Sequence, residues 1–227
     1  MQKRKIIIGT YDTALEGLWT LSAWSFSKAV ANEEYANVPG HNGPLDLSTA
    51  LTDGEPYYGS RELEVTLESS VGTRLEREER INQMVNRLDG YRFNITLPDD
   101  PLHYINGRVR VEKVYNTPAH AAVVVTATCE PWRYNNSETV VGLVATSTEQ
   151  TVSLINNGRR SVVPTVKVEG GTATIKFNTR EGVQTWTLSP REYEPRELPD
   201  LYLKTGAAPL TYRGSATITL TYREAVL

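Results

Sequence analysis

The sequence has little of what most enzymatic and metal-binding sites require. Cysteine occurs once and histidine three times, so no disulfide framework can form within the chain. The histidines, at His41, His103 and His120, are far apart and show none of the close ligand spacings typical of zinc sites. Neither a Walker loop nor a G-x-G-x-x-G motif is present. We therefore expect no metal, no cofactor and no enzymatic activity.

Charge of one sign is also scarce. The formal net charge is −3, from 24 basic and 27 acidic residues. Basic and acidic residues alternate in segments such as 74–80, which indicates a solvated face. Binding to a phosphate backbone would require clustered lysine and arginine. The composition therefore argues against a nucleic-acid-binding protein.

Long apolar runs are missing as well. No stretch approaches the roughly 20 apolar residues of a membrane span. Lys3, Arg4 and Lys5 precede an apolar run that stops at Ile8, so we expect no secretory signal. We expect synthesis in a reducing cytoplasm and no insertion into a membrane.

The single cysteine follows a run of valine, threonine and alanine that begins at Val123. Cys129 at the end of such a strand is expected to be a small buried hydrophobic residue rather than a reactive thiol. A nucleophilic pair with one of the histidines stays open as an alternative, because such partners meet only in the folded chain.

Most of the sequence alternates with the two-residue period of a half-buried strand. Between Arg61 and Glu68, Leu63, Val65 and Leu67 alternate with polar residues. Valine and threonine, which suit a pleated surface, are abundant. The sequence therefore predicts a mainly β fold.

One segment, Thr73 to Leu88, has helical periodicity instead. Thr73 and Glu76 have the spacing of a capping box. An apolar stripe at helical spacing follows, and Gly90 can end the helix in the left-handed conformation. We predict one amphipathic helix packed on a sheet; a nucleic-acid recognition helix is disfavoured by the glutamates on its polar face.

A domain boundary is predicted where Pro131 to Ser137 interrupts the strand pattern. Residues 1–131 would form a first domain of strands and one helix, at about 73–89. Residues 132–227 show short strands and closely spaced turns, which predicts a β-sandwich of jelly-roll or galectin-like type. Its last strand is free to pack back on the first domain.

The most specific segment runs from Asn37 to Leu67. Pro39-Gly40 and Gly43 form a turn, a polar insert from Ser48 to Gly59 follows, and Arg61 begins a strand. The segment contains no catalytic set of residues; its glycines determine the backbone shape, and its polar insert extends the loop. We predict that it contacts another subunit, through Pro39, Gly40, Gly43, Asp46, Asp53, Tyr57, Tyr58 and Arg61.

Two other kinds of site stay open. Paired carboxylates of a glycoside hydrolase could come from Asp46, Asp53, Glu55 or Glu62, if two of them faced each other across a cleft. Aromatic residues could stack on sugar rings, and the candidates are Trp132, Tyr134, Trp186 and Tyr193. For Trp186, in an alternating strand, packing inside the sandwich is the favoured interpretation.

The order of these segments resembles the distal tail protein family of long-tailed, non-contractile bacteriophages, the hub component of the baseplate. The residues behind this resemblance are Val38–Leu47, Tyr58 and Arg61, the helix from Thr73, Tyr104 with Gly107-Arg108, Cys129–Tyr134, Asn156-Asn157-Gly158 followed by Pro164–Val168, and Ile218–Arg223. They span nearly the whole chain. The family often has a basic and an acidic residue between the turn glycines, where this chain has His41-Asn42.

The resemblance implies a virion protein of the tail tip whose first domain forms a ring, typically hexameric. Such a ring joins the tail tube protein to tail-tip and receptor-binding or adhesin proteins, and DNA passes through it as transiting cargo during ejection. The second domain would face outward. The alternative function is a carbohydrate-binding sandwich that attaches the baseplate to cell-wall glycan.

Overall fold

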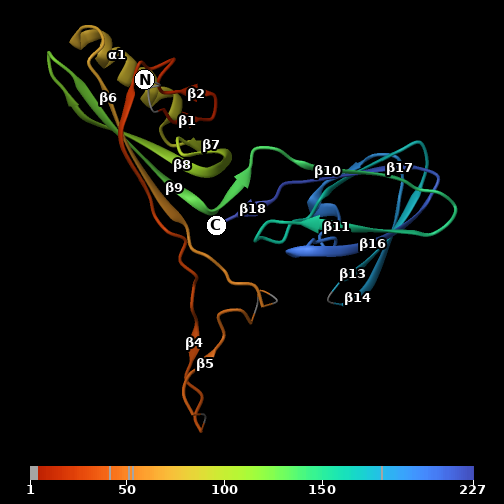
Figure 1. Cartoon of the computed structure of the whole chain (residues 1–227). Helices are drawn as coiled ribbons and strands as arrows, with labels where there is room; N and C mark the ends of the chain where they lie inside the picture. The colour runs from red at the N-terminus through yellow and green to blue at the C-terminus, as the bar shows by residue number, and fades with distance from the viewer. Residues whose placement is uncertain (1–4, 41, 51, 53, 180) are drawn as a thin grey trace. The chain divides into compact units, whose positions relative to one another are not determined.

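The computed structural model describes residues 5–40, 42–50, 52, 54–179 and 181–227. The chain divides into two compact units, which are described separately: residues 1–133 together with Leu227, and residues 134–226. The fold is mainly β with one α-helix among the described residues, which confirms the predicted fold class (Figure 1). In this part of the chain, no helix has the length and apolar character needed to cross a membrane.

The first unit is built on one sheet with the strand order β2-β1-β7-β8-β9-β6-β3. Its strands are β1 (Ile7–Ile8), β2 (Tyr11–Asp12), β3 (Thr20–Phe26), β6 (Arg61–Ser69), β7 (Arg92–Leu97), β8 (Asp100–Asn116) and β9 (Ala121–Asn135). A separate pair, β4 (Tyr35–Ala36) and β5 (Leu45–Asp46), lies in the connection between β3 and β6.

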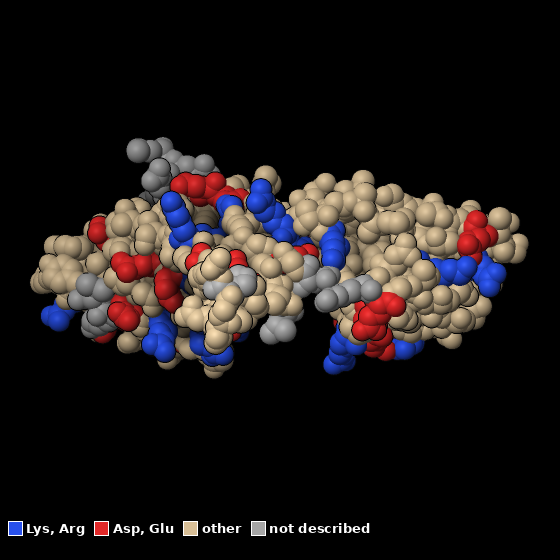
Figure 2. Space-filling view, turned by 90° about the horizontal axis from the view of Figure 1, so that it is seen from below, with Lys and Arg blue, Asp and Glu red and all other residues tan. Residues whose placement is uncertain are grey.

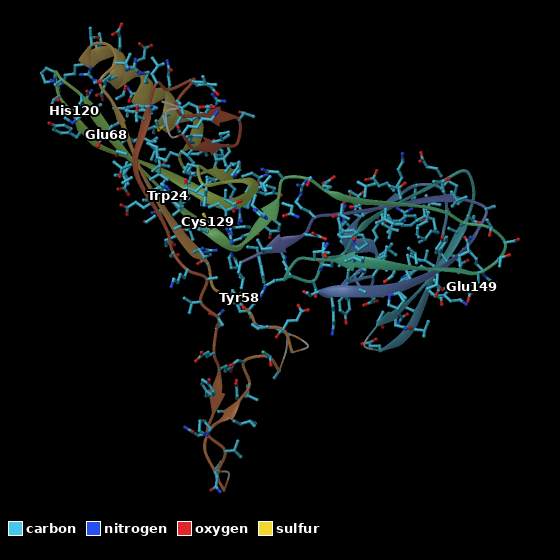
Figure 3. All side chains as sticks on the ribbon, viewed as in Figure 1. Trp24, Tyr58, Glu68, His120, Cys129 and Glu149 are labelled. Atoms are coloured by element: carbon cyan, nitrogen blue, oxygen red, sulfur yellow. The ribbon has the colours of Figure 1, made fainter. Side chains whose placement is uncertain are left out.

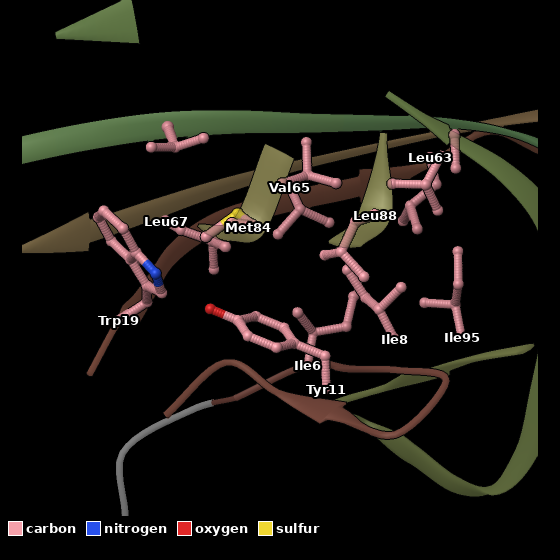
Figure 4. Close-up of a cluster of buried hydrophobic side chains, with 14 of the residues drawn as sticks. Ile6, Ile8, Tyr11, Trp19, Leu63, Val65, Leu67, Met84, Leu88 and Ile95 are labelled. Atoms are coloured by element: carbon pink, nitrogen blue, oxygen red, sulfur yellow. The ribbon is translucent and has the colours of Figure 1, made fainter. Parts of the chain in front are cut away.

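Strand β6 shows why the sheet has one covered face. Leu63, Val65 and Leu67 are each at most 2% exposed, while the intervening polar residues point to the other side. These three side chains pack in one cluster with residues of β1, β7 and the helix (Figure 4). The predicted alternation of apolar and polar residues along β6 therefore places its apolar side chains in the core.

Helix α1 (Arg74–Leu88) covers this face of the sheet. Thr73 is its N-cap and forms the predicted capping box with Glu76, whose carboxylate accepts from the Thr73 backbone N–H. Ile81, Met84 and Leu88 are buried. The helix therefore lies where the sequence pattern predicts it.

Arg77 departs from the expectation that residues 74–80 form a solvated face. Its side chain is 1% exposed, because it lies one turn before Ile81 on the buried stripe of α1. The guanidinium donates to the carbonyls of Thr117 and Pro118, at 2.6 and 2.9 Å, and to that of Gly72. These three backbone carbonyls accept hydrogen bonds from the guanidinium and so offset the cost of removing its charge from water.

Strand β9 is longer than the sequence predicted, since it continues through Pro131 to Asn135. The pairing between β6 and β9 ends at Arg61 and Cys129. Pro131 lies beyond that pairing, so its missing N–H costs no hydrogen bond of this ladder. His103 lies within β8, where its ring contacts the carboxylate of Asp100 at 2.7 Å.

The second unit contains two four-stranded sheets with the orders β10-β17-β12-β15 and β11-β16-β13-β14. Their strands are β10 (Thr139–Val144), β11 (Gln150–Asn156), β12 (Thr165–Glu169), β13 (Ala173–Thr179), β14 (Gly182–Leu188), β15 (Glu192–Tyr193), β16 (Gly206–Gly214) and β17 (Thr217–Tyr222). A 3-10 turn, η1 (Pro195–Glu197), and a short strand, β18 (Ala225–Val226), complete the elements. Inward residues of both sheets, including Val166, Ile218, Ile175 and Leu210, form a single core.

Candidate functional site

The connection between β3 and β6, residues 27–60, is the most unusual part of the first unit and is called the arm. None of its described residues (27–40, 42–50, 52 and 54–60) is buried. Figure 1 shows the arm as the orange segment with β4 and β5, extending away from β6. Because the arm has no core of its own, interactions other than apolar packing must hold its backbone in this conformation.

Backbone hydrogen bonds hold the two legs of the arm together. Near the sheet, Ala31 bridges Tyr58, and the N–H of Asn32 donates to the carbonyl of Tyr57 at 2.7 Å. Farther out, β4 and β5 pair antiparallel with Tyr35 opposite Asp46. The arm is therefore a long, irregular hairpin.

The predicted turn lies at the end of this hairpin. Gly40 and Gly43 have φ of +84° and +90°, a region that side chains with a Cβ rarely adopt. Their surroundings are open, since a Cβ added at either glycine would meet no atom within 4 Å. Pro39 is exposed beside them, and His41 lies outside the described residues. The glycines thus set a backbone shape, as the sequence indicated.

Asp46 organises the second leg locally. Its carboxylate accepts from the backbone N–H of Ser48 at 2.9 Å. The Ser48 hydroxyl and this N–H hold the pKa of Asp46 below its usual value. The hydroxyl of Ser48 also accepts from the N–H of Glu34, at 2.8 Å, on the first leg. Asp46 therefore stabilises the backbone of the second leg of the arm.

Arg61 fixes the base of the arm and is only 8% exposed. Its Nε donates to the carbonyl of Ser27 at 2.6 Å, and its Nη1 donates to that of Pro131 at 3.3 Å. The guanidinium also lies 3.6 Å from the ring centroid of Phe26. Burial, and then the charge of Arg133, lower the pKa of Arg61. Its side chain is therefore engaged within its own unit.

Tyr58 is the second fixed point at the base. Its ring meets that of Trp132 edge to face, with centroids 5.4 Å apart. The neighbouring Tyr57 is 61% exposed. Figure 3 shows Tyr58 where the arm leaves the sheet. The Tyr57-Tyr58 pair thus has one ring toward its own unit and one toward solvent.

Large apolar side chains on the arm are left uncovered. Their exposed fractions lie between 42% and 69%, and the residues are Val30, Tyr35, Val38, Leu45 and Tyr57. Apolar side chains gathered on one projecting segment are typical of a surface that a partner covers. Val30 and Tyr35 were not predicted as contact residues, because they lie before the predicted contact segment, which begins at Asn37. The signal that could have identified them is an apolar valine and a tyrosine among small and polar residues.

Asp53 was also predicted to be a contact residue, and it lies outside the described residues. Glu55 belongs to the arm and Glu62 to β6. Among the described residues no group of histidine, cysteine and carboxylate side chains has the arrangement of a metal site. Cys129 is 1% exposed, and burial raises its pKa to about 12, which is the environment of a structural thiol.

None of the four aromatic candidates for glycan stacking is fully exposed. Trp186 is partly buried against the core of the second unit, and Tyr193 lies in that core with Arg191 over its ring. Trp132 belongs to the first unit, whereas Tyr134 belongs to the second and contacts Arg160. Glycan binding through these residues stays a prediction, because none of the four aromatic side chains is fully exposed for stacking on a sugar ring.

Charged residues of both signs are interspersed on the face of the molecule in Figure 2. Ion pairs between neighbouring elements account for part of this mixture, such as that of Arg92 with Glu130 at 2.7 Å. This face therefore shows no broad basic field for phosphate.

Comparison with known proteins adds a solved structure from a bacteriophage adsorption apparatus, which has the same fold. It is the Dit protein (gp 19.1) of SPP1, described as a paradigm of the hub adsorption apparatus in phages that infect Gram-positive hosts. The match has a TM-score of 0.65 at 15% identity and covers 96% of this chain and 98% of that one. No family model matches the sequence, and no curated protein is similar enough to be matched. At the level of the fold, the resemblance inferred from the sequence is confirmed.

Proposed function

We propose that the chain is a structural component of a bacteriophage tail, a distal tail or baseplate hub protein without enzymatic activity. The observation behind this proposal is the arm, which is firmly held at its base and exposes apolar side chains along its length. The shared fold with a phage hub protein supports the same conclusion.

The first unit forms a ring, hexameric as in the family that the sequence resembles. A closed ring of identical subunits needs two different complementary patches on each subunit. The arm supplies one patch, through the exposed residues around Gly40, Gly43 and Tyr57. A neighbouring copy supplies the other. Tyr58 and Arg61 contribute indirectly, because they hold the arm to its own unit.

In this role the ring joins the tail tube protein to tail-tip and receptor-binding or adhesin proteins. DNA crosses it only as transiting cargo, which agrees with a formal net charge of −3 and with the mixed charges on the face in Figure 2. The protein is made in the host cytoplasm and resides in the virion, at the tail tip.

The test is the oligomeric state of the purified chain, measured by light scattering after size exclusion and by negative-stain images. A shortened arm can be made by replacing residues 33–56 with a glycine turn, because Asn32 and Tyr57 already pair. We expect rings from the natural chain and monomers from the shortened one.

A matched control separates the arm from general surface apolarity. Val30→Ser with Tyr35→Ser should weaken the ring, whereas Val140→Ser with Val144→Ser should not, since the latter pair is comparably exposed on β10 of the second unit. A strict monomer at high concentration, or intact rings from the shortened chain, would contradict the proposal.

A further inference from the structure

The sequence contains three Asn-Gly dipeptides, at Asn42-Gly43, Asn106-Gly107 and Asn157-Gly158. Asparagine before glycine is chemically labile, because the glycine N–H can reach the asparagine side-chain carbonyl when no Cβ hinders it. Reaction requires the local backbone to leave its folded geometry, so a rigid environment protects the site. The fold places these three dipeptides in very different environments.

Asn106-Gly107 is held within the sheet. Asn106 pairs with Asn94 across β7 and β8, and its side-chain oxygen accepts from Nε of Arg92 at 2.9 Å. Its amide nitrogen donates to the side chain of Asn94 at 2.9 Å. A Cβ on Gly107 would lie 3.3 Å from the Cα of Cys129, so this backbone is packed against β9. The dipeptide has no freedom to rearrange without opening the sheet.

Asn157-Gly158 is held by hydrogen bonds within the second unit. The attacking atom, the backbone nitrogen of Gly158, donates to the side-chain oxygen of Asn156 at 3.0 Å. Both the backbone N–H and the side-chain amide of Asn157 donate to Glu224, at 3.0 and 3.2 Å. Here the nucleophile and the electrophilic side chain are each engaged elsewhere.

Asn42-Gly43 lies at the end of the arm. Asn42 is exposed, and its side chain makes no hydrogen bond with any described residue. Gly43 has φ of +90°, and a Cβ added there would meet no atom within 4 Å. The arm has no buried described residue that would resist local rearrangement.

We propose that Asn42 is a site of selective deamidation in the folded protein. The backbone nitrogen of Gly43 attacks Cγ of Asn42, a C–N bond forms, and the side-chain nitrogen leaves as ammonia, which takes up the proton of the Gly43 amide. Water then opens the resulting cyclic imide at either carbonyl. The products have aspartate or isoaspartate in place of Asn42, with no oxidant or other reactant required.

The modification places a carboxylate at the turn, and the isoaspartyl form also adds a methylene to the main chain between Gly40 and Gly43. If the arm end contacts a second copy, as the proposed function holds, the product is an assembly-defective subunit. This consequence rests on the proposed function, whereas the modification does not.

The experiment incubates the full-length chain at mildly alkaline pH and follows deamidation by mass spectrometry of tryptic peptides. Cleavage after lysine and arginine separates the three sites into peptides 29–61, 93–108 and 134–159. Fragmentation assigns the modified residue within each peptide. A parallel sample in denaturant gives the rate that each dipeptide has without the fold.

We expect Asn42 to react at nearly the same rate in the folded and the denatured chain. Asn106 and Asn157 should be slowed by the fold by on the order of tenfold or more, since their reaction awaits local opening. Asn42→Gln should abolish the change in peptide 29–61, because glutamine needs a larger and less readily formed ring. Protection of Asn42 comparable to that of Asn106, or equal rates at all three sites in the folded chain, would overturn the proposal.

Asn42→Asp reproduces the charged product and tests the consequence separately. We expect fewer rings from this variant than from Asn42→Gln. If the natural chain forms no ring at all, the proposed function fails while the peptide rates still decide the modification.

Discussion

Arg61→Met tests whether the base of the arm is held by a buried charge. The substitution keeps much of the apolar side-chain volume but removes the donors to Ser27 and Pro131 and the contact with Phe26. A hydrogen bond from a charged donor contributes about 1.5–3 kcal/mol, and a partly buried cation–π contact about 0.5–2 kcal/mol. The desolvation of the guanidinium offsets part of this sum. We expect a net loss of about 2 kcal/mol.

The measurement is urea unfolding of the first unit, followed by tryptophan fluorescence. Trp186 is the one tryptophan in the second unit, so a Trp186→Phe background leaves Trp19, Trp24 and Trp132 to report on the first unit alone. With an m-value of about 2 kcal/mol/M, the midpoint should fall by about 1 M urea.

Arg110→Met is the matched control, because Arg110 is exposed on β8 and forms no ion pair or hydrogen bond with any described residue. Hydrogen exchange locates the effect: amides of Ser27, Asn32 and Gly59 at the arm base should exchange faster in Arg61→Met even where the core stays protected. A midpoint that moves no further than that of the control, together with unchanged exchange at the base, would refute the reasoning.

Three further predictions concern other parts of the chain. Thr73→Ala should lower the stability of the first unit by about 1 kcal/mol, since it removes the N-cap acceptor of α1, and urea unfolding measures this loss. Cys129 should react with a thiol reagent only after unfolding, because burial raises its pKa to about 12; rapid labelling of the native chain would contradict this. The pKa of Asp46 is lowered in the folded chain, so its ionised carboxylate stabilises the folded arm at pH values above its unfolded pKa. This stabilisation is lost as the pH falls through the lowered pKa of the folded state. Ser48→Ala should raise the Asp46 pKa in an NMR titration.

The local pattern of the chain was enough to predict strand β6 and helix α1. The alternation along β6 identified Leu63, Val65 and Leu67 as core residues, and the capping box identified the start of α1 at Thr73. Both signals act over a few residues, and both follow directly from backbone geometry. Trp186 also packs against the core of its unit, as its place in an alternating strand indicated.

Properties that depend on distant segments were missed. Arg77 was expected in solvent, since nothing near it in the sequence announces the carbonyls of Thr117 and Pro118 that receive its charge. The first leg of the arm was overlooked for the same reason: its partner strand begins only after the turn at Gly40 and Gly43. A hairpin whose legs pair across a long insert leaves no short-range signature in either leg.

The arm divides into two parts with different energetic roles. A two-stranded hairpin without a core is marginally stable by itself, so the contacts of Arg61 and Tyr58 at its base have to position it. Its outer part, with exposed apolar residues and the glycine turn, has no buried residue among those described. Under the proposed function, a partner subunit covers it. Changes at the base should therefore lower the stability of the first unit, whereas changes at the end should affect assembly alone. Val38→Ser tests this division, because Val38 is exposed near the end of the arm. A loss of monomer stability in this variant would contradict the division, and with it the view of the arm as an assembly element.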